Sequence, residues 1–234
     1  DWPCQPPSRF NTGSSRRRAS PYQTPAEKGQ SKSRIVTPDQ VGELLDVSRE
    51  TIEKFRAYLT LLEKWQRRIN LVSNSTLAEV WQRHILDSGQ LAAHYPPQTR
   101  QILDVGSGAG FPGLVLAIMG DVTVDLIESD QRKAVFLSNV IRELGLPAKV
   151  HNQRIETMPN LRPDVITARA LATVPKLLNL IETQMSPECV CLFLKGASIE
   201  DELTNLQSYT TMVATTHPSL SGSTGVVLEM KNPR

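Results

Sequence analysis

No stretch of this sequence is long and apolar enough to cross a membrane, and aromatic residues make up only 5% of it. A membrane-spanning helix needs about 20 consecutive, mostly apolar residues, whereas the apolar residues here fall into short runs. They still amount to 39% of 234 residues, enough for the core of one large domain or of a domain with an appendage. The composition therefore predicts a globular protein without a membrane segment.

Cysteine is scarce as well, and its spacing is typical neither of a metal site nor of a disulfide framework. Cys4, Cys189 and Cys191 form no CxxC pair, and no histidines cluster with them in the sequence. We therefore expect no metal. Cys189 and Cys191 should pack as small apolar side chains in a reducing compartment, which favours a cytoplasmic protein.

An excess of basic charge is missing from most of the chain. Residues 1–35 hold seven basic and two acidic side chains, so the net charge of +2 leaves −3 for the remainder. The basic pI is thus no evidence for a nucleic-acid-binding domain. Any contact of the folded part with RNA must come from a local patch.

The first 34 residues contain no Ile, Leu, Val or Met, but several Pro, Ser and Arg. Such a segment cannot bury enough apolar surface to offset the entropy lost on ordering, so residues 1–35 are predicted to form a disordered basic tail. The Arg- and Ser-rich composition resembles an organelle transit peptide, although the amphipathic leucines are missing. Import into an organelle is therefore the alternative to a cytoplasmic location.

Residues 36–98 predict an N-terminal helical segment. Thr37 to Gln40 has the pattern of a capping box with proline at the first helical position. A long helix is expected from about residue 48 to 68, because apolar residues up to Ile69 recur at three- and four-residue steps. Thr76 to Glu79 predicts a second capping box, which opens a helix that passes His84 and runs toward residue 95.

From residue 99 to 234 the sequence alternates short apolar runs with helical patterns, which predicts a parallel sheet covered on both faces. Strands are expected at 101–105, 122–127, 148–151, 164–168, 190–194, 211–216 and 225–230, and helices at 112–119, 131–144, 174–185 and 199–206. The close spacing of the last two strands indicates an antiparallel hairpin at the sheet edge. Seven strands with that ending predict an α/β fold of the Rossmann-like, class I methyltransferase type.

A cofactor loop is predicted where the first of these strands runs into a glycine-rich stretch. Gly106, Gly108 and Gly110 allow the backbone to turn sharply and to approach a ligand. Glu128 closes the next strand about 20 residues later, where it can accept hydrogen bonds from ribose hydroxyls. Strand, loop and following helix together form a site for a nucleotide-like ligand.

The acidic residue before the loop distinguishes between two possible cofactors. The sequence from Gly108 to Gly113 matches the dinucleotide motif GxGxxG, but that match alone is weak. Asp104 suits the ammonium and sulfonium groups of S-adenosylmethionine, whereas it would repel the pyrophosphate of a dinucleotide. We therefore expect an S-adenosylmethionine-dependent methyltransferase. An NAD-dependent oxidoreductase and a non-catalytic nucleic-acid-binding module with the same fold are the alternatives.

Several motifs, taken in order, resemble one family in particular. They are KWQRRINL at 64–71, RHILDS at 83–88, LDVGSGAGFPG at 103–113, RIE at 154–156, RA at 169–170 and LKG at 194–196. Over about residues 38–230 the chain is similar to the bacterial small-subunit (16S) ribosomal RNA guanine-N7 methyltransferases, the RsmG or GidB family. The resemblance implies methyl transfer to a guanine of that RNA, free or in the 30S subunit. We expect a monomer.

The resemblance also implies a set of cofactor-binding residues. The glycine loop would contact the cofactor, the acidic end of the second strand would hold its ribose, an Ile-Glu pair would lie against the adenine, and an arginine would lie beside the methionine end. With the two residues that the loop itself indicates, the candidates are Asp104, Gly106, Gly108, Phe111, Glu128, Ser129, Asp130, Ile155, Glu156 and Arg169.

The chemistry of guanine N7 explains why no general base is evident. This atom carries an exposed lone pair, so transfer needs proximity and orientation rather than deprotonation. Arg169 and Lys195, each at the end of a predicted strand, are therefore the expected catalytic residues, while His84 is expected to be a packed histidine. Contacts to RNA phosphates, or alternatively a plain solvated face, are expected for Arg67, Arg68, Arg83, Arg132 and Lys133.

A shortened chain that begins at Ile35 tests the prediction for the tail. Because residues 1–34 lack the apolar side chains needed to dock on a domain, this chain should melt within error of the full chain and should retain methyl transfer. Thermal unfolding and a methylation assay compare the two. A large drop in melting temperature would show that the tail packs on the protein.

Overall fold

The computed structural model describes residues 36–196, 199–204, 206, 210–222 and 225–233. The disorder predicted for residues 1–35 concerns a segment outside these described residues. Residues from Ile35 onward form one compact unit, in which the N-terminal helices contact the helices of the sheet domain. Among the helices described, none is both long and apolar enough to cross a membrane.

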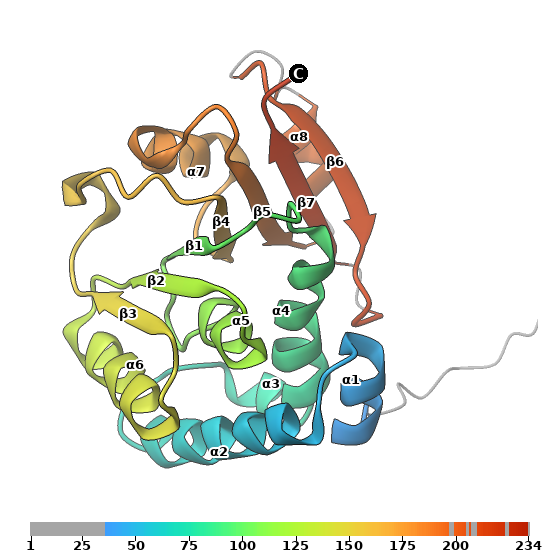
Figure 1. Ribbon diagram of the computed structural model, residues 1–234, viewed down its shortest axis with the longest axis vertical. Helices are drawn as coiled ribbons and strands as arrows, with labels where there is room; N and C mark the ends of the chain where they lie inside the picture. Colours follow the sequence, from blue (N-terminus) through green and yellow to red (C-terminus); the bar gives the residue numbers. More distant parts are fainter. Residues whose placement is uncertain (1–35, 197–198, 205, 207–209, 223–224, 234) are drawn as a thin grey trace, which may run out of the picture. The chain divides into compact units, whose positions relative to one another are not determined.

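A seven-stranded sheet forms the centre of this unit, in the order β3-β2-β1-β4-β5-β7-β6 (Figure 1). Its strands are β1 (Gln101–Val105), β2 (Thr123–Ile127), β3 (Ala148–His151), β4 (Val165–Arg169), β5 (Val190–Lys195), β6 (Val213–Pro218) and β7 (Val226–Lys231). The first five pair in parallel, and β7 is antiparallel to both β5 and β6. The predicted strands are confirmed to within two residues at each end, and so is the antiparallel hairpin.

The strand order reverses between β1 and β4, and this reversal positions the site. From β1 the chain moves outward through β2 to β3 and then returns to the other side of β1. In open α/β sheets, ligands bind in the crevice at the carboxyl ends of the strands where the order reverses in this way. The loop after β1 lies at this point.

Helices cover both faces of the sheet, as predicted. They are α5 (Gly113–Met119), α6 (Gln131–Leu144), α7 (Val174–Ile181) and α8 (Ile199–Leu203), with the short 3-10 turns η3 (Ile155–Thr157) and η4 (Glu182–Gln184). The helix expected at 174–185 ends at Ile181 and continues only as η4, and α8 ends at Leu203, three residues earlier than expected.

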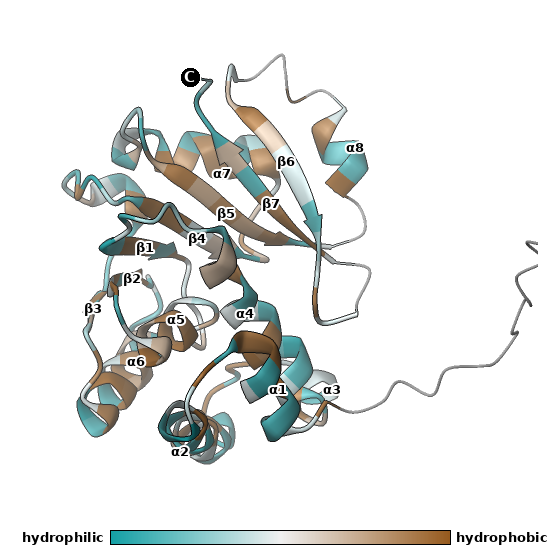
Figure 2. Ribbon diagram, turned by 45° about the vertical axis from the view of Figure 1, so that its right-hand side comes forward, coloured by the Kyte–Doolittle hydropathy of each residue, from teal (hydrophilic) through white to brown (hydrophobic). Residues whose placement is uncertain are grey.

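Alternate residues of each inner strand face two different cores. On β1, for example, Ile102 packs into the core under α5 and α6, while Leu103 packs into the core under α7. Buried parallel strands are apolar on both sides for this reason. In Figure 2 the inner strands β4 and β5 are brown, the hydrophobic end of the scale. The edge strand β6 is instead mostly exposed.

The N-terminal helices pack against the α5–α6 side. They are α1 (Pro38–Leu45), α2 (Arg49–Gln66), α3 (Asn74–Leu77), the π-helical turn η1 (Trp81–Leu86), α4 (Asp87–Gly89) and the 3-10 turn η2 (Gln90–His94). The first predicted capping box is confirmed, because Thr37 and Gln40 exchange both of its hydrogen bonds. Helix α2 buries its predicted apolar face but ends at Gln66, so Ile69 is only half-buried.

The capping box predicted at Thr76 to Glu79 is wrong, and so is the single helix expected after it. Ser73, not Thr76, precedes the short helix α3, and the chain then passes through η1, α4 and η2. The Thr76 hydroxyl lies 2.9 Å from Nε2 of His84. A hydroxyl that was expected to cap a helix therefore binds a buried histidine instead.

Candidate active site

The loop after β1 turns on three glycines, as the sequence predicts. Gly106, Gly108 and Gly110 have φ angles of 70°, 57° and 97°, in the left-handed region that favours glycine. A Cβ at Gly106 would lie 2.7 Å from the Leu171 side chain, whereas a Cβ at Gly108 would meet nothing closer than a backbone oxygen at 3.8 Å. The space in front of Gly108 is therefore open to a ligand.

Contacts from two directions hold this loop in place. From the sheet, the carbonyl of Ile127 accepts hydrogen bonds from the amides of Gly106 and Ser107, each at 3.0 Å. From α2, the buried Tyr58 donates its hydroxyl to the carbonyl of Ala109 at 2.5 Å. The N-terminal helices are thus part of the support of the site, a role that their sequence pattern did not indicate.

A cavity of about 370 Å³ opens in front of the loop. Seven of the ten predicted cofactor residues line it, namely Gly106, Gly108, Glu128, Ser129, Ile155, Glu156 and Arg169. Leu171 also lines it, with 41% of its surface exposed, and so does Lys133, which the sequence suggested as an RNA contact. Residues that are distant in sequence therefore meet around one space.

Glu128, at the end of β2, connects the wall of this cavity to the loop. Its side chain is buried, with Oε2 accepting from the amide of Gly108 at 2.8 Å and Oε1 from the amide of Asp130 at 2.7 Å. Two carboxylate oxygens offer about four acceptor positions. The carboxylate can therefore hold the loop and still accept hydrogen bonds from ligand hydroxyls.

Two further predicted residues do not line the cavity, for different reasons. Asp130 is the N-cap of α6, and its Oδ1 accepts from the amides of Arg132 and Lys133 at 2.9 and 3.3 Å. Phe111 is buried, and its ring is stacked on that of His84 with 4.7 Å between the centres. An acid between a strand and a helix suits a helix cap as well as a ribose, which is why the sequence could not separate the two uses.

Asp104 is the third predicted residue outside the cavity lining, and it is completely buried on β1. Its Oδ1 accepts from the Thr167 hydroxyl of β4 at 2.8 Å, and no described residue donates a hydrogen bond to its Oδ2. Burial raises the pKa of Asp104 to about 6, against the opposing effect of the Thr167 hydrogen bond. A carboxylate that is costly to bury in this way is stabilised by a cationic ligand nearby.

A second cavity, of about 420 Å³, shares Arg169 and Ala170 with the first. Side chains of the N-terminal helices, the end of β5 and the loop between β6 and β7 line it, including Thr76, Arg83, His84, Asp87, Lys195 and Ser221. The two cavities therefore meet at Arg169, the last residue of β4. Arg83 is exposed here, as an RNA contact would require.

Arg169 is fixed by contacts to the N-terminal helices. Its Nη2 lies 2.7 Å from Nδ1 of His84, its Nη1 donates to the carbonyl of Arg83 at 3.2 Å, and its guanidinium carbon lies 5.0 Å from the centre of the Phe111 ring. A guanidinium has donors only. Nδ1 of His84 must therefore be the acceptor, and in the neutral ring Nε2–H then donates to Thr76.

These contacts keep His84 neutral. Burial lowers the pKa of His84 to about 3, helped by the charges of Arg169 and Arg83. Both ring nitrogens are also engaged, so the ring can neither take up nor release a proton near neutral pH. The described geometry agrees with the expectation of a packed, hydrogen-bonded histidine rather than a general base.

Lys195 lies at the edge of the second cavity, held by two contacts. Its Nζ donates to the carbonyl of Ala172 at 2.9 Å and pairs with Glu202 of α8 at 2.8 Å. An ammonium has three donors, so one N–H has no partner among the residues that the structure describes. The other predicted RNA contacts lie elsewhere: Arg67 and Arg68 are exposed after α2, and Arg132 is exposed beside Asp130.

The sequence did not indicate the role of Asp87, although this residue belongs to the RHILDS motif at 83–88. Its Oδ1 accepts from the hydroxyls of Ser219 and Ser221 at 2.9 and 3.3 Å and from the Gln90 side chain at 3.0 Å. These partners come from the loop between β6 and β7 and from η2. Only the tertiary structure reveals that this aspartate joins the edge hairpin to the second cavity.

Solved structures that share this fold include methyltransferases. The chain is similar to the mitomycin 7-O-methyltransferase MmcR, with a TM-score of 0.54, 14% identity, and coverage of 86% of this chain and 73% of that one. For a methyltransferase from Methanococcus maripaludis the values are 0.53, 12%, 75% and 92%. A mutant of MtNAS in complex with S-adenosylmethionine gives 0.51, 17%, 85% and 85%. These likenesses show the fold, which is the Rossmann-like fold of class I methyltransferases.

A more specific relation comes from the sequence as a whole. The family described as rRNA small subunit methyltransferase G matches residues 51–226. The protein of that name from Rhodospirillum rubrum is 47% identical over 195 residues, 83% of this chain and 97% of that protein. Its counterpart from Rhodospirillum centenum is 50% identical over 184 residues, 79% and 85% of the two chains. The chain therefore belongs to the rRNA small subunit methyltransferase G family, and its cofactor is S-adenosylmethionine.

The residues around the first cavity fit this cofactor. The open space at Gly108 lets a ligand reach the loop backbone, and Glu128 keeps acceptor positions for ribose hydroxyls. The apolar Leu171 offers a surface for an aromatic base. Asp104 does not line this cavity, but its buried carboxylate lies on β1 just before the loop and would attract the ammonium and sulfonium of a bound cofactor.

Replacing Gly108 by valine tests the approach path. A branched side chain here should fill the space in front of the loop and reduce S-adenosylmethionine affinity at least a hundredfold, as measured by calorimetry. Gly145→Val is the matched control, because Gly145 has nearly the same φ, 59°, and open surroundings at the end of α6. Both variants should lose similar stability from backbone strain. Equal cofactor affinity in the two would contradict the assignment.

The buried carboxylate of Asp104 predicts a pH-dependent difference in stability. The ordinary pKa of an aspartate is about 3.9, so between pH 4 and 6 the folded protein holds more protons than the unfolded chain at this site. Its contribution to the free energy of unfolding therefore falls as the pH rises through this range, by at most about 3 kcal/mol. Denaturant titrations should show wild type losing stability relative to Asp104→Asn from pH 4 to 7. A difference that is independent of pH would contradict the buried charge.

Proposed function

We propose that this protein transfers the methyl group of S-adenosylmethionine to N7 of a guanine in small-subunit ribosomal RNA. The main support is the meeting of two cavities at Arg169, one that fits the cofactor and one that is open to a second ligand. The related proteins are named as ribosomal RNA methyltransferases of the small subunit. Bound S-adenosylmethionine supplies an electrophilic methyl group on its sulfonium.

The cofactor residues in this proposal are those predicted from the sequence, but three of them have an indirect role. Gly106 and Gly108 offer the loop backbone, Glu128 and Ser129 hold the ribose, and Ile155 and Glu156 lie against the adenine. Asp104, Phe111 and Asp130 would act indirectly, without touching the cofactor. Asp104 fixes the end of β1, Phe111 packs against the Arg169 guanidinium, and Asp130 caps the start of α6.

The transfer step needs neither a general base nor a metal ion in this proposal. Guanine N7 is already nucleophilic, so the protein has only to align it with the methyl group and to exclude water. His84 supports this, since its neutral ring is engaged at both nitrogens. Arg169 places a positive charge between the cavities, where it can orient the cofactor carboxylate or the guanine O6.

The second cavity offers groups of the right kind for a guanine. Asp87 can accept hydrogen bonds from N1–H and the exocyclic amine of the base, and Lys195 has an N–H left for a phosphate or O6. A base presented in this way must leave its stack, as single-stranded RNA allows. We propose this cavity as the guanine site, with Arg169 and Lys195 as its catalytic residues.

Ribosomal RNA as the substrate implies a local basic surface, because the folded part is acidic overall. Arg83 lines the second cavity, so it is the candidate that we propose for a contact with the RNA next to the target base. We propose a monomer as the active form. We propose that it acts in the cytoplasm. An oxidoreductase using NAD is not favoured, because the family is one of methyltransferases.

Substitution of Arg169 tests the proposed step. Removing one charge-assisted contact costs about 1.5–3 kcal/mol, so Arg169→Ala should slow methyl transfer to small-subunit RNA roughly 10- to 200-fold. Arg169→Lys should restore little, because an ammonium cannot reproduce the planar fork that reaches Arg83 and His84. Single-turnover rates, with circular dichroism to confirm folding, give the comparison.

Two controls separate positioning from general-base catalysis. His84→Ala should slow transfer less than Arg169→Ala, since it removes a neighbour of the guanidinium rather than the charge itself. With saturating cofactor, whose cationic groups would keep Asp104 ionised, the pH–rate profile should stay flat above about pH 6 in wild type, because the pKa of His84 is about 3 and N7 is unprotonated. An ionisation near neutrality that disappears in His84→Ala would overturn the proposal.

A further inference from the structure

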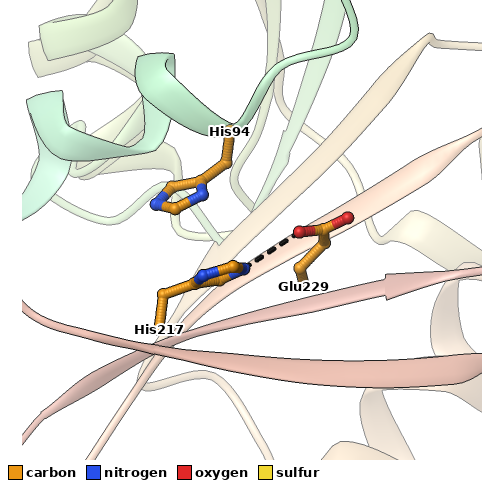
Figure 3. Close-up of side chains that lie close together, drawn as sticks. All are labelled: His94, His217 and Glu229. Atoms are coloured by element: carbon orange, nitrogen blue, oxygen red, sulfur yellow. Dashed lines mark hydrogen bonds and ion pairs between the residues drawn. The ribbon is translucent and has the colours of Figure 1, made fainter.

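A cluster of two histidines and a glutamate lies outside both cavities. Among the described residues, His94, His217 and Glu229 form the one such group whose ligand atoms, one per residue, all lie within 4.8 Å of one another. Figure 3 shows the three side chains converging from different elements. His94 ends η2, His217 lies on β6 and Glu229 on β7. The cluster therefore joins the N-terminal helices to the edge hairpin.

The strand register brings two of these residues together on one face of the hairpin. Thr215 pairs with Glu229, so His217, two residues on, is its diagonal neighbour. Nε2 of His217 lies 3.0 Å from Oε2 of Glu229. The ring of His94 lies against that of His217, with 4.3 Å between the centres. In the part of the chain that the structure describes, no hydrogen bond to a ring nitrogen of His94 is found.

We propose that His94, His217 and Glu229 bind a zinc ion that fastens the β6–β7 hairpin to the N-terminal helices. Two imidazoles and a carboxylate are a donor set that Zn²⁺ prefers, with water as the fourth ligand. Bonds of about 2.1 Å in a tetrahedron place ligand atoms about 3.4 Å apart. The widest separation here would have to close by at most about 1.4 Å, which side-chain rotation can provide.

The surroundings of the cluster support this proposal. Lys231 donates to Oε1 of Glu229 at 2.8 Å, which leaves Oε2 for the metal and orients the carboxylate. All three ligands are partly exposed, so an ion can reach them from solvent.

The sequence alone predicted no metal because these ligands do not cluster along the chain.

The proposed ion would also stabilise one wall of the second cavity, although it does not lie in that cavity. The loop that follows His217 carries Ser219 and Ser221, which donate to Asp87. A metal at the cluster would hold this loop, and with it one wall of the second cavity. The proposal itself rests on the cluster geometry and not on the identity of the methylated base.

Metal titration of the full chain tests the proposal directly. After removal of metals with a chelator, calorimetry with zinc chloride should show one ion bound per chain. At a hundredfold excess over Kd the melting temperature should rise by about 5–10 °C. Cobalt(II) used in place of zinc should give the strong visible bands of a four- or five-coordinate ion, without the charge-transfer band of a thiolate ligand.

Single substitutions distinguish this site from unspecific metal binding. His94→Ala and His217→Ala should each weaken zinc binding at least tenfold and remove the cobalt bands, and Glu229→Gln should weaken it less. His151→Ala is the matched control, because His151 lies on β3 at the other edge of the sheet and contacts Asp125 instead. The control should bind zinc as wild type does.

Three outcomes would overturn the proposal. They are the absence of any zinc or cobalt binding by the wild-type chain, a thiolate band that places the metal on cysteine, or unchanged binding in the cluster variants. His94→Asn keeps the test valid if His217→Ala fails to fold, since His94 makes no hydrogen bond within the described part of the hairpin or helices. In that variant, too, binding must weaken for the proposal to stand.

Discussion

The hydrogen bond between Arg169 and His84 is the contact on which the arrangement of the site depends. It joins the end of β4 to the N-terminal helices and separates the two cavities. Because a guanidinium can only donate, the bond fixes the tautomer of the histidine and keeps its ring uncharged. Phe111 completes the arrangement, since its ring contacts both the histidine and the arginine. The side chains of Arg169, His84 and Phe111 thus hold the glycine loop, the end of β4 and the turn η1 together.

The glycine loop is restrained in a comparable way. Glu128 and Ile127 hold it from the sheet, and Tyr58 holds it from α2. The site is therefore already formed by contacts within the protein, and little loop ordering remains for the cofactor to drive. Preorganisation of this kind reduces the entropy cost of binding. The N-terminal helices contribute to this state through Tyr58, and the sheet does so through Ile127 and Glu128.

Much of this structure could be predicted from the sequence, because local patterns set it. The strands, the glycine loop and the acid at the end of β2 follow from apolar runs and from the need for glycine at positive φ. The use of individual polar side chains could not be predicted. Thr76 has the pattern of a helix cap but binds His84, and Asp130 suits a ribose but caps α6. Asp87 and the His94 cluster depend on partners far away in the chain, which no local pattern reports.

The order of the segments along the chain also determines when each cavity can form during synthesis. The contact that anchors the glycine loop joins residues 51 positions apart, and the lining of the first cavity extends no further than Leu180. The contacts of the edge hairpin with Gln90 and Asp87 span 130 and 132 positions. Chains emerge from the ribosome with the N-terminal part first. A chain that has emerged up to Leu180 therefore holds every lining residue of the first cavity, whereas the second cavity still lacks Lys195 and the loop of the edge hairpin.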